Sequence, residues 1–316
     1  MGSALVVGDR GSGLTTFVGL LYAAQLRLGT EERDEFRFSA DRETIRQLEG
    51  IYGELVAGRF PDWDADWDTH PLSFVFAFRS GTFPRLRGAG VSHDGGFDSF
   101  RVQVGGISVE TVAELSEHDA ILENSTRELL RSPVVLPLVD ASRLLPLVEE
   151  MDRRPLERYD RMLAATLDLL SRFLSAGRVR KLRTLYPMFV VTKLDQCPSE
   201  TLKRFHIPAG VPSSWPAGTR ESVGENILTS YLPETLRLIR TTKGRRGGSI
   251  ALPKWFFSGL QLVAGPEGVR IARRSRIPVG GWEPEYPFEE YRILIRQLAV
   301  LAHRLPTWDE STLRPD

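Results

Sequence analysis

The sequence predicts an α/β fold in which a mixed, mainly parallel sheet carries helices on both faces and has one antiparallel strand at its edge. Three observations lead to this prediction. The chain opens with a buried strand, a glycine-rich turn and a helix; strands and helices alternate from about residue 114 onward; and residues 72–78 and 97–104 alternate as an antiparallel pair does. In such a sheet, ligands bind at the carboxyl ends of the parallel strands.

The opening elements contain a phosphate-loop pattern with one side chain replaced. Residues 5–7 predict a buried strand and residues 17–26 the helix that follows. The usual loop between two such elements is G-x-x-x-x-G-K-[ST], and here Leu14 takes the place of the lysine. Backbone amides at a helix start still attract anions without that lysine. We therefore expect binding more than catalysis, and the predicted phosphate-binding residues are Gly8, Asp9, Arg10, Gly11, Ser12, Gly13, Leu14, Thr15 and Thr16.

The next segments predict a helix, an acidic loop and the antiparallel pair. Apolar residues at helical spacing predict a helix from about Ser39 to Ala57, with Ser39 as its N-cap. Residues 58–71 hold too many turn-forming residues for regular structure and predict an acidic loop. The strands at 72–78 and 97–104 follow, separated by a glycine-rich segment.

The remaining segments predict a β/α alternation. The expected helices cover about 114–130, 155–176, 222–240 and 291–305, and the expected strands cover 134–139, 188–191 and, as the last one, 255–257. Residues 198–220 are proline-rich and predict an irregular excursion. We expect one enlarged domain over residues 1–316, with insertions at about 39–70 and 198–250 and a C-terminal extension at 261–316.

Composition excludes some classes of partner. The formal net charge of the 316 residues is zero, which argues against a general nucleic-acid binder. Apolar runs fall short of the roughly 20 residues that cross a bilayer, and the N-terminus lacks the pattern of a secretory signal, so we expect a cytoplasmic protein with no membrane span. The single cysteine, Cys197, has no neighbouring histidine that would indicate a metal or thiol site.

The order of motifs resembles a Ras-like P-loop GTPase of the translation-factor-related (TRAFAC) class. Thr192-Lys193-Leu194-Asp195 follows a predicted strand and is similar to the [NT]-K-x-D motif that recognises guanine, and residues 256–260 are similar to the last motif of the family. The resemblance implies that GTP or GDP is bound, with the base held by Thr192, Lys193, Asp195, Ser258 and Gly259. The helix and turn at 39–61 are also similar to a branch of large prokaryotic GTPases that includes double-GTPase domains.

The resemblance also implies switch and metal residues, and it shows two departures. Thr69 takes the place of the first-switch threonine that holds Mg²⁺ and senses the γ-phosphate, and Thr15 takes the place of the loop residue that holds Mg²⁺. The D-x-x-G motif falls on residues 103–106, so that Gln103 replaces the aspartate while Gly106 keeps the γ-phosphate-sensing position. Phosphoryl transfer depends on positioned positive charge and metal, so the changes at Leu14 and Gln103 predict slow hydrolysis.

Three functions remain open at this point. The first is a guanine-nucleotide-binding switch or scaffold with slow or absent hydrolysis, which meets a protein partner through its switch loops or insertions. The second is a pseudo-GTPase that binds no nucleotide, because the Leu14 side chain could fill the phosphate site. The third is an active GTPase in which Arg10, or an arginine of a partner, supplies the missing charge. Candidate catalytic residues are therefore Arg10, Thr69 and Gln103, and Mg²⁺ is expected at Thr15 and Thr69 only together with nucleotide.

Overall fold

The computed structural model describes most of the chain. The described residues are 2–9, 11–33, 35–61, 72–79, 97–104, 132–144, 154–176, 184–208, 212–216, 218–242, 249–265, 268–275 and 281–304. The predicted helix at 114–130 and most of the predicted acidic loop lie outside these ranges.

The predicted mainly parallel sheet is confirmed. In the described residues its order is β2-β3-β4-β1-β5-β6-β7, and β8 also pairs with β6. Strands β4, β1, β5, β6, β7 and β8 pair in parallel. The bounds are β1 Gly2–Val7, β2 Phe36–Ala40, β3 Leu72–Arg79, β4 Phe97–Val104, β5 Val134–Asp140, β6 Thr184–Thr192, β7 Ser249–Ile250 and β8 Lys254–Phe257.

One strand of this sheet, β3, runs against its neighbours, as the alternation of residues 72–78 predicted. It pairs antiparallel with β4 on one side and with β2 on the other, so β2 forms the outer edge. The prediction that Ser39 caps a helix is wrong, because Ser39 lies within β2. The helix α2 (Arg42–Val56) is capped by Asp41, whose carboxylate accepts a hydrogen bond from the Thr44 amide at 2.8 Å.

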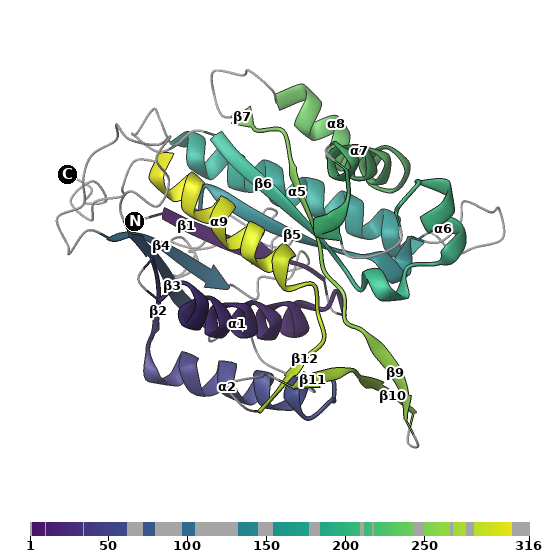
Figure 1. Ribbon diagram of the computed structural model, residues 1–316. Coiled ribbons are helices and arrows are strands. Elements are labelled where there is room, and N and C mark those ends of the chain that lie inside the picture. Colours follow the sequence, from purple (N-terminus) through teal and green to yellow (C-terminus); the bar gives the residue numbers. More distant parts are fainter. Residues whose placement is uncertain are drawn as a thin grey trace, which may run out of the picture.

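Helices cover both faces of the sheet (Figure 1). Along β1, Ala4 and Val6 face one apolar cluster while Leu5 and Val7 face the other, which is the two-residue period of a strand buried on both sides. The first face carries α1 (Leu14–Glu31), with α2 packed on it, and α9 (Phe288–Arg304). The second face carries α5 (Arg154–Ala176), α7 (Thr219–Tyr231) and α8 (Pro233–Thr242).

The second half of the chain is more divided than the sequence predicted. The helix expected at 222–240 is two helices, because Pro233 cannot continue α7 and instead begins α8. The proline-rich segment contains a short helix, α6 (Ser199–Arg204), and a 3₁₀ turn, η5 (Pro212–Ser214). Residues 254–257 are not the last strand, since two hairpins follow: β9 (Leu262–Gly265) with β10 (Gly268–Ile271), and β11 (Arg273–Ser275) with β12 (Trp282–Pro284).

The β9–β10 hairpin projects from the body of the molecule (Figure 1). Among the described helices, none is both long and apolar enough to span a bilayer.

The contact between α7 and β8 depends on a glycine. A Cβ atom added at Gly224 would lie 2.1 Å from the ring of Trp255. That ring cannot give way easily, since it is buried and stacks on Phe189 with ring centroids 4.8 Å apart.

We predict that Gly224→Ala lowers the free energy of unfolding by about 1–3 kcal/mol, because it forces extra volume into a packed contact. Gly50→Ala is the matched control: a Cβ there meets nothing within 4 Å. That control should gain up to about 1 kcal/mol from helix propensity. Urea denaturation of the two variants checks this, and equal stabilities would contradict the packing argument.

Candidate functional site

The phosphate-loop pattern lies at the carboxyl end of β1, where parallel strands present ligand sites. Gly11 and Gly13 have φ angles of 84° and 85°, a left-handed conformation that glycine adopts without strain. Gly13 is the N-cap of α1, and no side chain of the described residues caps this helix start. The first-turn amides of α1, at Leu14, Thr15 and Thr16, therefore remain available to an anion.

The hypothesis that no nucleotide is bound was motivated by the Leu14 side chain, and the structure shows what this side chain contacts. Its side chain is partly buried and packs against the apolar cluster beneath α1. It does not line the neighbouring pocket described below. The leucine that replaces the lysine therefore packs against the core, and the loop carries one positive charge fewer than the usual pattern.

Two consecutive residues at the end of β6 hold two consecutive carbonyl groups of the loop. Thr192 Oγ1 donates to the Ser12 carbonyl at 2.6 Å, and Lys193 Nζ donates to the Gly11 carbonyl at 2.6 Å. Lys193 adopts a left-handed backbone conformation with φ 51°, which is unusual for a residue with a side chain. The first part of the T-K-x-D segment is thus bonded directly to the phosphate loop.

A network of charged side chains surrounds the same loop. Lys193 Nζ donates to Asp140 Oδ2 at 2.7 Å, and Arg143 Nε lies 3.5 Å from that oxygen. Arg143 also donates through Nη1 to the Asp9 carboxylate. Two cations and two carboxylates therefore neutralise one another around the loop.

Sequence reasoning missed Asp140 and Arg143. Asp140 is the last residue of β5, and its other carboxylate oxygen accepts hydrogen bonds from the amide and hydroxyl of Ser142 at 2.9 and 2.6 Å. Arg143 lies in the 3₁₀ turn η2 (Ala141–Arg143) that follows. Their place at the carboxyl end of a central parallel strand was the signal that could have identified them.

Burial raises the pKa of the Asp9 carboxyl above its ordinary value, although the hydrogen bond and charge of Arg143 act in the opposite direction. Burial acts this way because the charged form loses hydration inside the protein.

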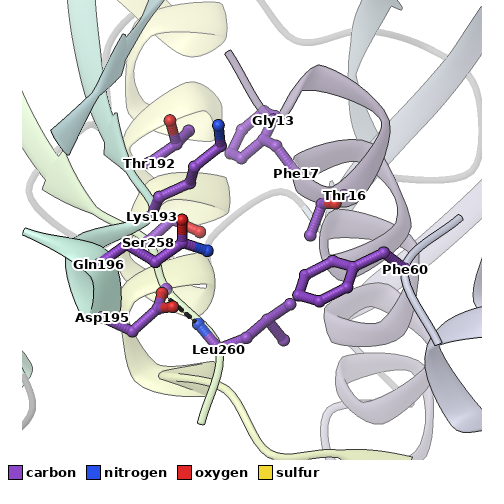
Figure 2. A pocket seen from close by; sticks show the side chains of 11 residues that line it. Gly13, Thr16, Phe17, Phe60, Thr192, Lys193, Asp195, Gln196, Ser258 and Leu260 are labelled. Carbon is purple, nitrogen blue, oxygen red and sulfur yellow. Dashed lines mark hydrogen bonds between the residues drawn. The ribbon is translucent and has the colours of Figure 1, made fainter. Parts of the chain in front are cut away.

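A small pocket that is partly open to solvent adjoins the loop. Figure 2 shows Asp195, Gln196 and Ser258 on one side and Thr16 and Phe60 on the other. The aromatic ring of Phe60 faces the pocket and was not predicted to contribute to it. The lining residues are Gly13, Thr16, Phe17, Phe60, Thr192, Lys193, Asp195, Gln196, Ser258, Gly259 and Leu260.

The Asp195 carboxylate is fixed by the turn that follows β8. Its Oδ1 atom accepts a hydrogen bond from the Leu260 amide at 2.9 Å (Figure 2). A Cβ at Gly259 would lie 2.8 Å from that oxygen, so this close approach requires glycine. The turn is itself held to β6 by bonds from Ser258 N to Val191 O and from Leu194 N to Ser258 O, at 2.7 and 3.0 Å.

The described residues test only part of the predicted site. Arg10, Thr69 and Gly106 lie outside them, and Gln103 is described only in its backbone, which pairs β4 with Leu5 of β1. Hydrogen bonds join the loop residues Gly11 and Ser12 to Lys193 and Thr192. The predicted residues that line the adjoining pocket are Gly13, Thr16, Thr192, Lys193, Asp195, Ser258 and Gly259. Within the described ranges, no group of histidine, cysteine and acidic side chains forms a metal site.

Comparison with known proteins leaves the family open. No protein-family model and no curated protein matches the chain. Solved structures do match, among them a signal recognition particle receptor SRb-GTP/SRX complex from Chaetomium thermophilum, with 12% identity over 81% of this chain and 90% of that chain and a TM-score of 0.34. Values this low leave the function of this chain to be argued from its own residues.

The raised pKa of Asp9 predicts a pH dependence of stability. Because the folded state holds this proton more tightly than the unfolded state, Asp9 lowers the free energy of unfolding as pH rises from the ordinary pKa of 3.8 to the raised value. Asp9→Asn has no carboxyl to ionise and should not show this decrease. The free energy of unfolding of Asp9→Asn should therefore rise relative to that of the natural protein across this pH interval.

Asp41→Asn is the control with the opposite sign. The hydrogen bonds from Thr44 lower the pKa of Asp41, so its stabilising contribution is present above 3.8 and is lost as pH falls through the lowered value. Urea denaturation across the acidic range compares the two variants. An Asp9→Asn variant whose relative stability did not change with pH would contradict the burial argument.

Proposed function

We propose that this protein has a P-loop GTPase-like site that binds GTP or GDP and hydrolyses GTP slowly or not at all. In this proposal the phosphates lie against residues 8–16 and the base lies in the adjoining pocket against Thr192, Lys193, Asp195, Ser258 and Gly259. One observation carries it: the predicted base-recognising segment is hydrogen-bonded to the predicted phosphate loop through Thr192 and Lys193. A nucleotide requires a fixed distance between its base site and its phosphate site. The bonds from Thr192 and Lys193 would keep this distance constant.

The position of Asp195 suits guanine. A carboxylate offers about four acceptor positions, and the Leu260 amide occupies one of them. The rest can accept the ring N–H and the amino N–H of guanine, whereas adenine offers no such adjacent donor pair. Phe60 on the opposite side provides an apolar surface for a planar base.

The charges around the loop favour binding over turnover. Leu14 provides no ammonium group, and Lys193 is engaged with Asp140 and the Gly11 carbonyl. Phosphoryl transfer needs uncompensated positive charge at the phosphates. Mg²⁺ would be held by Thr15 and Thr69 once nucleotide is present, with Gly106 at the γ-phosphate and with Arg10 and Gln103 as the remaining candidates for slow hydrolysis.

A protein that binds no nucleotide is the second candidate function. The observation that favours it is the Asp9 carboxylate, which brings negative charge into the phosphate loop. Under either proposal a protein partner in the cytoplasm would meet the switch segments or the insertions at 39–70 and 198–250. The third candidate, hydrolysis rescued by Arg10 or by a partner's arginine, requires turnover that is lost in Arg10→Ala or that appears only with the partner.

Calorimetric titration with GTP, GDP and ATP, in the presence of Mg²⁺, tests the leading proposal. We expect micromolar binding of GTP and GDP and at least tenfold weaker binding of ATP, about 1.4 kcal/mol. A guanine nucleotide at one hundred times its dissociation constant should stabilise the fold by about 2.7 kcal/mol and raise the melting temperature. Equal binding of ATP, or a melting temperature that no nucleotide changes, would contradict guanine recognition.

A change at Asp195 tests the base site alone. Asp195→Asn should weaken GDP binding and strengthen xanthosine diphosphate binding, because xanthine has an acceptor where guanine has an amino donor and the amide supplies the matching donor. Asp168→Asn, which removes the same charge from the exposed side of α5, should change neither affinity. A preference that stays with guanine in Asp195→Asn would show that this carboxylate does not contact the base.

A further inference from the structure

The guanidinium of Arg143 lies against the phosphate loop from outside it. Its Nη2 atom is 3.5 Å from the position that a Cβ at Gly11 would occupy, and Nη1 donates to Asp9. The turn η2 sets this position, because it follows β5 directly and β5 pairs in register with β1. Arg143 therefore approaches the loop from the neighbouring strand end, independently of the loop's own sequence.

Arg143 differs from Lys193 in what it holds. Lys193 donates to a loop carbonyl and to Asp140, which lies outside the loop. Arg143 also lies near Asp140, but its hydrogen bond goes to a carboxylate that belongs to the loop itself, and its side chain keeps 30% of its accessible surface. A guanidinium fork binds carboxylates and phosphates in the same geometry, so one anion can replace the other on it.

Asp9 is a weak partner for this role. Its side chain is only 18% exposed, and burial disfavours its ionised form. It also lies at the place in the loop where negative charge would repel a phosphate. A phosphate group can pair with Arg143 at this place only if the Asp9 carboxylate moves aside. Asp9 then loses its charge partner.

We propose that Arg143 is a phosphate-binding residue of this site, and that in the ligand-free protein the Asp9 carboxylate occupies the place on Arg143 that a phosphate oxygen takes. The inference rests on the proposed function of the loop as a phosphate site. In this proposal Arg143 supplies the positive charge that the lysine supplies in the usual loop. Asp9 competes with the phosphate for Arg143. Binding then exchanges one ion pair for another, and no covalent step is involved.

Substitutions at Arg143 and at Asp9 should change the affinity for nucleotides in opposite directions. Arg143→Gln should weaken GTP and GDP binding by about tenfold to a hundredfold, the range expected for a lost charged hydrogen bond. The affinity of Arg143→Lys should lie between those of Arg143→Gln and the natural protein. Asp9→Asn should strengthen binding of both nucleotides several-fold, because the competing charge is gone. Guanosine, which has no phosphate, should bind equally to all of these variants.

The matched controls are Arg172→Gln and Asp168→Asn on α5, which make the same charge changes at an exposed pair. Melting temperatures without ligand are measured for every variant, so that loss of fold is separated from loss of contact. If Asp9→Asn and Arg143→Gln both weaken binding, or if Arg143→Gln weakens guanosine as much as GDP, the pair is structural and the proposal is overturned.

Tripolyphosphate separates this inference from the proposed function. If the natural protein binds tripolyphosphate with the same dependence on Arg143 and Asp9 but shows no preference for guanine, the guanine assignment fails and the phosphate role of Arg143 stands. If guanine nucleotides bind selectively and Arg143→Gln has no effect on their affinity, the guanine assignment stands and the phosphate role of Arg143 fails. If neither nucleotides nor tripolyphosphate bind the natural protein, both proposals are overturned.

Discussion

The bond between Thr192 Oγ1 and the Ser12 carbonyl joins the two halves of the site, and the arrangement of the loop depends on it. Both residues are buried, and leaving such a carbonyl without its donor costs about 1–3 kcal/mol. The neighbouring bond from Lys193 to Gly11 extends the contact across the loop. Because these bonds come from the protein itself, the loop is shaped before any ligand arrives, which lowers the entropy that binding must overcome.

The same contacts restrict what the site can do. The bonds from Thr192 and Lys193 use the loop carbonyls and leave the amides at the start of α1 without a side-chain cap from the described residues. Among the described residues, Lys193 is engaged with Asp140 and the Gly11 carbonyl, and Leu14 carries no charge, so less positive charge is available to stabilise a phosphoryl transition state than in the usual loop. Under the proposed function, this arrangement favours binding a nucleotide over hydrolysing it, and switching would come from exchange of the bound nucleotide.

Much of the fold could be predicted because the central strands are apolar on both faces and the loop between β1 and α1 has a recognisable pattern. The strand β2 escaped notice because it is five residues long and lies at the edge, where only one face is packed. The boundary between α7 and α8 was readable from Pro233. The pairing of Asp9 with Arg143 could not be read, because it joins residues 134 positions apart and depends on strand order. The core position of Leu14 likewise needed the structure, since periodicity does not show which way a helix's first residue turns.

A crystal structure of the protein grown with a non-hydrolysable GTP analogue and Mg²⁺ tests the central claim most directly. The account predicts that the phosphates lie on the amides at the start of α1 with Arg143 in contact and Asp9 displaced. The base should lie against Asp195, and the Thr192 bond to Ser12 should be unchanged. Analogue bound elsewhere, or a loop that keeps its Asp9–Arg143 pair at saturating analogue, would contradict it.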